Sequence, residues 1–215
     1  MPQLPGRYRA VVFDMDGLLL DTERLWQRSE EALFARHGVE FTFADKLAVM
    51  GTSYAVTRRY FAERLGYPPE QGDQLVDELH AFMLAELQRE VAARPGAVKL
   101  VERLRGWVPL GLASNSGREL VDVALTTARL ADAFDAIVTA ADVVAPKPAP
   151  DIYLLACERL GVSPLDALAL EDSAPGIAAA KAAGLTCIAV PQFAETDVSA
   201  ADHVIESLEE LLVER

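Results

Sequence analysis

The chain has 215 residues, of which 51% are hydrophobic and 25% charged, and its formal net charge is −13. This composition fits a folded globular protein with a substantial core and excludes wholesale disorder. The acidic balance argues against a nucleic-acid partner, which requires clustered Lys and Arg, and against binding to an anionic membrane surface. A small anionic substrate stays possible if a metal ion and one or two basic groups control the local field.

Two features of the sequence predict a cytoplasmic protein. Cys157 and Cys187 are the only cysteines and lie in apolar segments, which is typical of reduced core cysteines rather than of a disulfide framework. The first residues, MPQLPGRYR, lack the apolar stretch of a signal peptide. Because no run of the chain approaches 18 apolar residues, we expect no membrane span.

The apolar run at residues 10–13 predicts a buried first strand, and two carboxylates, Asp14 and Asp16, follow it directly. Ionised carboxylates at the end of a buried strand are unfavourable unless a cation compensates their charge. The pair therefore favours a hard cation such as Mg²⁺, or a division of nucleophilic and proton-transfer roles. The alternative is a solvated turn, because Asp and the following Gly17 are common turn residues.

Apolar residues at helical spacing dominate the chain from there to about residue 91. The first predicted helix spans residues 22–37, with Thr22 as its candidate cap and Gly38 as its stop. Further helices are predicted at residues 43–49, 53–65 and 69–91. Since no strand pattern interrupts them, we predict an all-helical unit over residues 19–91.

From residue 95 onward, strands and helices alternate. The predicted strands are 109–113, 136–139, 167–170, 186–190 and a short one at 203–205; the predicted helices are 96–105, 118–129, 151–160, 174–183 and 207–213. This alternation is typical of parallel strands joined by crossover helices. The first strand must join the same sheet, because the helical unit offers it no partner. We therefore predict an α/β fold with a doubly wound parallel sheet, formed by residues 1–18 and 92–215 and interrupted by the helical unit.

Polar side chains lie just beyond several of the predicted strands, where α/β sheets bind ligands. Besides Asp14 and Asp16, they are Ser114, Asn115, Lys147, Glu171 and Asp172. Taken singly, each has a plain alternative: a helix cap for the Ser-Asn pair, a solvated Lys, and an acidic pair at a helix N-terminus. Taken together, they supply acids for Mg²⁺, a nucleophile, and a lysine and a hydroxyl for a phosphoryl group.

Such a set of groups suits phosphomonoester hydrolysis. The ester resists attack because it is anionic, so Mg²⁺ and Lys147 would offset its charge. One Asp carboxylate can attack phosphorus and form an aspartyl-phosphate. A second acid can protonate the leaving alkoxide and then, as a base, activate water.

Four segments in this order resemble the four motifs of the haloacid dehalogenase superfamily: FDMDGLLLDTE, ASNS, APKPAPDIY and LEDSAPGIAAAKAAG. The resemblance spans essentially the whole chain and points to the subgroup with a helical cap inserted after the first strand. Within it, the chain resembles sugar-phosphate phosphatases and β-phosphoglucomutase-like proteins. The resemblance implies a Rossmann-like core (residues 1–18 and 92–215), an inserted helical cap domain (residues 19–91), Mg²⁺ as cofactor and a small phosphorylated metabolite as substrate. We expect a monomer, with a dimer as the alternative.

By the same resemblance, Asp14 is the nucleophile and Asp16 the general acid/base. Ser114 and Lys147 would bind the transferring phosphoryl group, assisted by Asn115. Dehalogenases of the superfamily lack the second acid because no alkoxide needs a proton, so the presence of Asp16 disfavours dehalogenation.

The resemblance also implies a metal site. Its ligands would be Asp14, the backbone carbonyl of Asp16, and Asp172. Glu171 would lie near the ion and contact it through water.

A phosphosugar mutase is the alternative within the same class. The β-phosphoglucomutases carry a cap His and a cap Arg, the latter for the second phosphate, and an ungapped alignment places Trp26 and Tyr54 at these positions. Neither side chain is a cation, which favours a phosphatase; Arg58 or Arg59 is an alternative source of positive charge. A phospho-acceptor signalling domain is the alternative from a different class, although such domains are shorter and lack a helical insertion.

The cap is expected to select the substrate. The candidates to face it are Trp26, Met50, Gly51, Thr52 and Tyr54. Packing within the cap is the alternative for Trp26 and Met50, and capping of the following helix is the alternative for residues 51–53.

Overall fold

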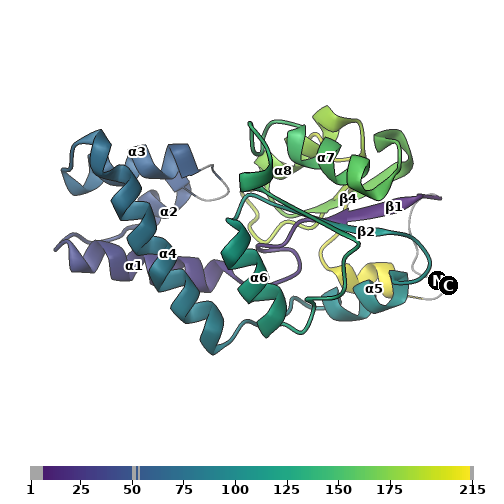
Figure 1. Cartoon of the computed structure of the whole chain (residues 1–215), viewed down its shortest axis with the longest axis horizontal. Helices are drawn as coiled ribbons and strands as arrows, with labels where there is room; N and C mark the ends of the chain where they lie inside the picture. The colour runs from purple at the N-terminus through teal and green to yellow at the C-terminus, as the bar shows by residue number, and fades with distance from the viewer. Residues whose placement is uncertain (1–6, 50–51, 53, 214–215) are drawn as a thin grey trace.

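The computed structural model describes residues 7–49, 52 and 54–213. It consists of a parallel sheet covered by helices and, to one side, a group of helices formed by the segment inserted after the first strand (Figure 1). Two predicted cap residues, Met50 and Gly51, lie outside the described residues.

The sheet has six parallel strands in the order β3-β2-β1-β4-β5-β6, which confirms the predicted doubly wound fold. The strands are β1 Ala10–Phe13, β2 Leu110–Ser114, β3 Ala136–Thr139, β4 Ala167–Glu171, β5 Thr186–Ala189 and β6 His203–Val204. The central strand β1 pairs with β2 and β4, so that Phe13 stands opposite Leu112 and Leu170. The carboxyl ends of these three strands are therefore neighbours, and the residues that follow them meet at one edge of the sheet.

Helices cover both faces of the sheet. They are α5 Ala97–Leu104, α6 Arg118–Thr127, α7 Asp151–Leu160 and α8 Ala174–Ala183. Val11 and Phe13 pack with the buried residues of α5 and α6, whereas Val12 packs with those of α7 and α8. Both faces of β1 are thus buried, which explains why its sequence is continuously apolar rather than alternating.

The inserted segment forms the helices α1 Glu23–Arg36, α2 Phe43–Val49, α3 Tyr54–Leu65 and α4 Gly72–Arg89. They enclose a separate apolar cluster that includes Leu33, Phe34 and Phe61. The second half of α4 leaves this cluster, since Met83 and Leu87 pack with the residues beneath the sheet. The helices of the insertion are therefore anchored to the sheet through α4.

The two chain connections between these parts run side by side. Asp21 N–H donates to the Ala92 carbonyl, and Arg94 N–H donates to the Leu19 carbonyl, both at 2.8 Å. The boundaries predicted at residues 18/19 and 91/92 fall in these connections, outside the helices.

The structure contains short 3₁₀ segments that the sequence interpretation did not predict. A 3₁₀ turn at Pro69–Gln71 precedes α4, because Pro68 and Pro69 fix the backbone at its start. Further 3₁₀ turns lie at Ala140–Asp142 and Pro164–Asp166. The last predicted helix is a 3₁₀ helix, Leu208–Leu212, held at its start by a capping box of Ser207 and Glu210.

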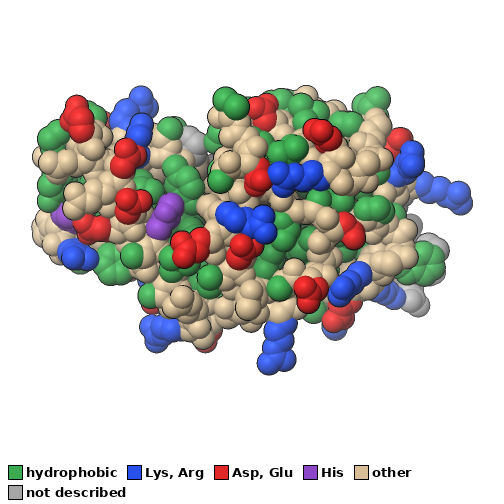
Figure 2. Space-filling view, in the orientation of Figure 1, with side chains coloured by type: hydrophobic (Ala, Val, Ile, Leu, Met, Phe, Trp, Pro, Cys, Tyr) green, Lys and Arg blue, Asp and Glu red, His purple; other side chains and the backbone are tan. Residues whose placement is uncertain are grey.

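The cysteines, the helix lengths and the surface charges bear on where the protein can reside. Cys157 and Cys187 are buried and unpaired. Within the described part of the chain, no helix combines the length and the apolar character needed to cross a membrane. On the face shown in Figure 2, acidic and basic side chains are interspersed rather than gathered by sign.

Candidate active site

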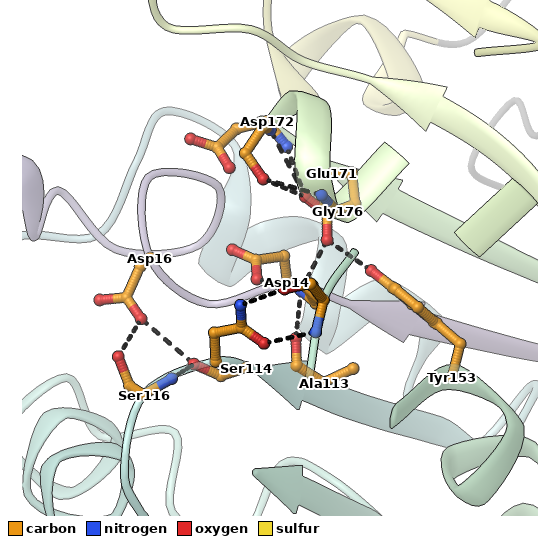
Figure 3. A network of polar contacts seen from close by, with 12 residues as sticks. Asp14, Asp16, Ala113, Ser114, Ser116, Tyr153, Glu171, Asp172 and Gly176 are labelled. Atoms are coloured by element: carbon orange, nitrogen blue, oxygen red, sulfur yellow. Dashed lines mark hydrogen bonds and ion pairs between the residues drawn. The ribbon is translucent and has the colours of Figure 1, made fainter. Parts of the chain in front are cut away.

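The residues predicted from the strand ends meet at the carboxyl edge of β1, β2 and β4. Asp14 follows β1, Ser114 ends β2, and Glu171 ends β4. In Figure 3, Asp14 lies between Glu171 and Asp172 on one side and Ser114 on the other. The strand order alone produces this convergence, since these three strands are adjacent in the sheet.

Lys147 lies at the centre of the site and is 2% exposed. Its ammonium group donates to Asp14 Oδ1 at 2.6 Å, to Glu171 Oε1 at 2.6 Å and to the Ala113 carbonyl at 2.8 Å. Burial alone would lower the pKa of Lys147, but the carboxylates of Asp14 and Glu171 outweigh it and raise the pKa. Lys147 is therefore charged, and the alternative of a solvated lysine is wrong.

Tyr153 of α7 is a member of this network to which the sequence gave no role. Its hydroxyl donates to Glu171 Oε1 at 2.7 Å, and its ring centre lies 5.2 Å from the Lys147 ammonium. Burial and the nearby Glu171 carboxylate raise the pKa of Tyr153, so the hydroxyl keeps its proton and acts as a donor. The sequence offered one signal for this role: Tyr153 belongs to the APKPAPDIY segment and lies on the helix face that packs against the sheet.

Glu171 is fully buried, and protein groups surround both of its carboxylate oxygens. Oε1 accepts from Lys147 and Tyr153, while Oε2 accepts from the Ser173 hydroxyl and from the N–H groups of Asp172 and Ser173. The cap of α8 is Ser173, whose hydroxyl accepts from Gly176 N–H at 3.2 Å. The alternative in which the Glu171-Asp172 pair serves only as a helix cap is therefore wrong.

Asp14, Glu171 and Asp172 form a buried acidic cluster that could hold a metal ion, since one carboxylate oxygen from each lies within 4.8 Å of the others. Burial raises the pKa of both Asp14 and Asp172, and the neighbouring carboxylates raise them further. One ammonium group, that of Lys147, does not balance three carboxylates. Oxygen ligands in such a cluster are the chemistry that Mg²⁺ prefers, so the residues present fit this ion.

The Asp16 side chain turns away from this cluster, as Figure 3 shows. Its Oδ2 accepts from Ser114 and Ser116, at 3.2 and 2.8 Å. Its Oδ1 accepts from the Thr22 hydroxyl at 2.8 Å and from the Trp26 indole N–H at 3.2 Å. Asp16 is thus held jointly by the loop after β2 and by the start of α1.

The hydrogen bonds to Asp16 correct the prediction that Thr22 caps α1, and they add Ser116 to the site. Thr22 occupies the N-cap position of α1, but its hydroxyl makes no capping bond and is directed to Asp16 instead. Ser116 has no role in the sequence interpretation, although it belongs to the quoted ASNS segment.

Asn115 fixes the loop that carries Lys147. Its amide oxygen accepts from Lys147 N–H at 2.9 Å, and its amide group donates to the Lys147 carbonyl at 3.2 Å. The N-cap of α6 is Gly117, so the alternative in which Ser114 and Asn115 cap this helix is wrong. Ser114 is fully buried, and its hydroxyl bonds to Asp16 and Ser116.

A cavity of about 400 Å³ lies between the sheet edge and the inserted helices. Its lining includes Asp14, Asp16, Asn115, Lys147 and Asp172 on the sheet side. Of the cap residues predicted to face a substrate, Trp26, Thr52 and Tyr54 line it. The acids and the lysine are therefore open to a small molecule that enters between the two parts of the chain.

Tyr54 also joins the two parts of the chain directly, because its hydroxyl accepts from Gly117 N–H at 2.9 Å. Burial raises the pKa of Tyr54 to about 12, so it is a neutral group. Arg58 and Arg59 are exposed and are not among the described residues that line the cavity. Arg58 instead pairs with Asp73 at 2.9 Å.

Three charged residues of the inserted helices line the cavity although the sequence interpretation passed over them: Glu23, Glu30 and Lys46. Lys46 and Glu30 are buried, at 9% and 4% exposure. Charged residues on an amphipathic helix are usually solvated, so nothing in the local pattern marked these as buried. Only the packing of α2 against α1 brings them together.

Comparison with known proteins gives consistent matches. A family model described as haloacid dehalogenase-like hydrolase matches residues 8–184. Hexitol phosphatase B of Escherichia coli (strain K12) is 33% identical over 189 residues, which cover 87% of this chain and 85% of that protein.

Two solved structures resemble the chain over almost its full length. CbbY from Rhodobacter sphaeroides, crystallised as a mutant with xylulose-(1,5)bisphosphate, is 29% identical with a TM-score of 0.83, and the match covers 94% of this chain and 95% of that one. β-Phosphoglucomutase from Clostridium difficile shares the fold, with a TM-score of 0.84 at 22% identity over 95% and 93% of the two chains. Because the family model extends from the first strand through the acidic cluster and α8, this chain belongs to the haloacid dehalogenase-like hydrolases.

Proposed function

We propose that this chain is a Mg²⁺-dependent phosphatase that hydrolyses small phosphomonoesters, in particular sugar or polyol phosphates, through an aspartyl-phosphate intermediate. The observation that carries the proposal is the position of Asp14. It lines the cavity, pairs with the Lys147 ammonium at 2.6 Å and belongs to an acidic cluster suited to a divalent cation. The similarity to hexitol phosphatase B supports the polyol phosphate class.

Asp14, Asp172 and the backbone carbonyl of Asp16 would hold the Mg²⁺ ion. When bound, the ion supplies positive charge to the phosphoryl oxygens and balances the acidic cluster. Glu171 would act through others, because its oxygens already accept from Lys147, Tyr153 and the backbone at the start of α8.

Asp14 would be the nucleophile. A carboxylate oxygen of Asp14 forms a bond to phosphorus, and the bond from phosphorus to the leaving oxygen breaks. Lys147 holds this carboxylate in place and offsets negative charge as the substrate approaches. Ser114 and Asn115 would complete the phosphoryl site, Asn115 by fixing the backbone of Lys147.

Asp16 would transfer the proton. In the first step it gives a proton to the leaving oxygen; in the second it takes one from the water that attacks the aspartyl-phosphate, which releases inorganic phosphate and restores Asp14. The hydrogen bonds from Thr22, Trp26, Ser114 and Ser116 would fix the orientation of this carboxylate. The inserted segment would then take part in the chemistry, because Thr22 and Trp26 bond to this carboxylate.

The first test replaces the nucleophile. Asp14→Asn removes the attacking oxygen anion but keeps the side-chain shape, so we expect turnover of p-nitrophenyl phosphate with Mg²⁺ to fall by about a thousandfold or more. Glu31→Gln, an exposed change on α1, is the matched control and should stay close to wild type. Near-full activity of Asp14→Asn would overturn the assignment of the nucleophile.

A second assay separates hydrolysis from phosphoryl transfer between sugars. With β-glucose 1-phosphate and a bisphosphate activator, a phosphatase releases inorganic phosphate, whereas a mutase gives net isomerisation with little release. We expect phosphate release. A long-lived aspartyl-phosphate without turnover would instead favour a signalling domain, a function that membership of a hydrolase family does not support.

A further inference from the structure

The end of the cavity formed by the inserted helices carries a compact charged cluster. Glu23 and Glu30 come from α1 and lie seven positions apart, so they share one face of the helix. Lys46 comes from α2, and its ammonium lies 3.1 Å from Glu23 Oε2 and 3.1 Å from Glu30 Oε2. All three residues line the cavity that Asp14 enters from the sheet side.

The contacts within this cluster neither balance its charge nor use all of its hydrogen-bonding groups. Two carboxylates and one ammonium leave one net negative charge in a largely buried position, which is unfavourable without a further partner. Burial raises the pKa of Glu30 against the pull of Lys46. Glu23 Oε2 is buried, and the structure gives it an ion pair with the Lys46 ammonium at 3.1 Å but no hydrogen bond from the described residues.

A hydroxyl group matches these unused groups. The Lys46 ammonium has three N–H donors. Among the described residues, it donates a hydrogen bond to Glu30. Lys46 thus has an unused N–H donor beside the Glu23 carboxylate, which can accept further hydrogen bonds besides its ion pair with Lys46. A hydroxyl both accepts and donates, so it can use both at once, whereas a phosphate offers chiefly acceptors.

The charge balance of the cavity points the same way. Lys46 and Lys147 are the basic residues among the described ones that line it, and each lies within 3.1 Å of two carboxylates. Glu195 and Asp197 add further acids to the lining. An anionic group placed at the Lys46 end would therefore meet a net negative field.

We propose that Glu23 and Lys46 determine substrate specificity by binding a hydroxyl of an uncharged, polyhydroxylated leaving group, and that the same cluster rejects a second phosphate. Glu30 is the positioning residue that holds Lys46. This inference rests on the proposed phosphatase function and narrows it to monophosphates of neutral sugars or polyols.

The test compares three substrates with wild-type enzyme and Mg²⁺: sorbitol 6-phosphate, sorbitol 1,6-bisphosphate and p-nitrophenyl phosphate, which has no hydroxyl for the cluster. We expect kcat/KM for the monophosphate to exceed that for the bisphosphate by about tenfold or more. In Glu23→Gln, which removes the net negative charge, the ratio of bisphosphate to monophosphate kcat/KM should rise by about tenfold.

Lys46 is tested together with Glu30, so that its removal does not leave the buried Glu30 carboxylate without its partner. The double variant Lys46→Met with Glu30→Gln keeps one net negative charge in the cluster and removes the ammonium. Its KM for sorbitol 6-phosphate should rise about tenfold with a smaller change in kcat, and the preference for sorbitol 6-phosphate over p-nitrophenyl phosphate should fall accordingly. Far-UV circular dichroism and thermal unfolding check that each variant is folded; if the double variant is not, Glu23→Gln tests the proposal alone.

Glu31→Gln is the matched control, since Glu31 is an exposed acid beside Glu30 on the same helix. It should keep all substrate ratios within about twofold of wild type. Unchanged ratios in both cluster variants, or a wild-type preference for the bisphosphate, would overturn the inference and leave the phosphatase function standing. Failure of the wild type to hydrolyse any of the three substrates would instead refute the proposed function, and the inference with it.

Discussion

At the scale of single residues, two glycines let the backbone pass directly beneath the carboxylates of the site. A Cβ atom on Gly176 would overlap the Glu171 carboxylate, and one on Gly17 would overlap the Asp172 carboxylate. Gly17 also has a left-handed backbone, with φ of +84°, and its carbonyl accepts from Gln192 at 2.6 Å. The position of the acids thus depends on the absence of a side chain at these two residues.

Gly17→Ala is predicted to disrupt the proposed metal site, in addition to the strain that it places on the left-handed backbone. The new methyl group must push the Asp172 carboxylate aside, so we expect the Mg²⁺ concentration needed for half-maximal activity to rise by about tenfold or more. Titration of activity with Mg²⁺ measures this.

Gly106→Ala is the control for that prediction. Gly106 has nearly the same φ, +85°, but among the described residues no neighbouring atom lies within 4 Å of the position that its new methyl group would occupy. Both variants should lose about 1–2 kcal/mol of unfolding free energy from left-handed strain. The Mg²⁺ response of Gly106→Ala should match wild type. An equal effect of the two substitutions on the Mg²⁺ response would show that contact with Asp172 does not matter.

At the scale of elements, α2 and α3 are tied together by one buried carboxylate, Asp45. It accepts from Thr42 N–H at 2.7 Å, from the Tyr60 hydroxyl at 2.6 Å and from Arg64 Nε at 2.8 Å. Burial would raise the pKa of Asp45, but the hydrogen bonds from Thr42, Tyr60 and Arg64 lower it far below its usual range. The ionised carboxylate is therefore the form that joins the two helices.

Asp45→Asn is predicted to lower the unfolding free energy at pH 7 by about 2 kcal/mol, since it weakens hydrogen bonds to a charged group. A lowered pKa in the folded state contributes stability that is present above the ordinary value of 3.8 and is lost as the pH falls below it. The difference between variant and wild type should therefore shrink in acid. Urea denaturation at several pH values measures it. Asp73→Asn, which affects an exposed pair with Arg58, should have little effect at any pH.

The elements themselves were largely predictable from local pattern. β1, α2 and α8 begin and end at the predicted residues, because the apolar pattern and, for α8, the terminal Gly184 carry that information. The last segment is a 3₁₀ helix because a capping box and packing of Leu208 and Leu211 hold only one short turn. Thr22 fails as a cap because a tertiary partner, Asp16, competes for its hydroxyl.

At the scale of the whole molecule, the candidate site divides into a predictable and an unpredictable half. The half on the sheet follows mainly from strand order, which is why Asp14, Asn115 and Asp172 could be anticipated as neighbours. The half on the inserted helices depends on how these helices face the edge of the sheet. Neither the burial of Lys46 between Glu23 and Glu30 nor the reach of Trp26 to Asp16 has a local signal.

Trp26 provides a test of this contact between the two parts. Its indole N–H donates to Asp16, and its ring packs against both the cluster beneath the sheet and the cluster of the inserted helices. Trp26→Phe removes the donor but keeps most of the packing, so we expect kcat/KM for a phosphomonoester to fall about tenfold with a loss of only about 1 kcal/mol in stability. Trp107→Phe is the matched control, because Trp107 is 67% exposed and should be nearly neutral.

The same pair of variants reports on the contact by fluorescence, since the chain has only two tryptophans. In Trp107→Phe, all tryptophan emission comes from Trp26 in the cavity lining, and it should change when Mg²⁺ and orthovanadate, a phosphate analogue, are added together. In Trp26→Phe, the emission of Trp107 should not respond, because that residue lies outside the cavity lining. If activity survives in Trp26→Phe and the emission of Trp26 does not respond to the ligands, then the indole is not needed to orient Asp16, and the hydroxyls of Thr22, Ser114 and Ser116 are sufficient.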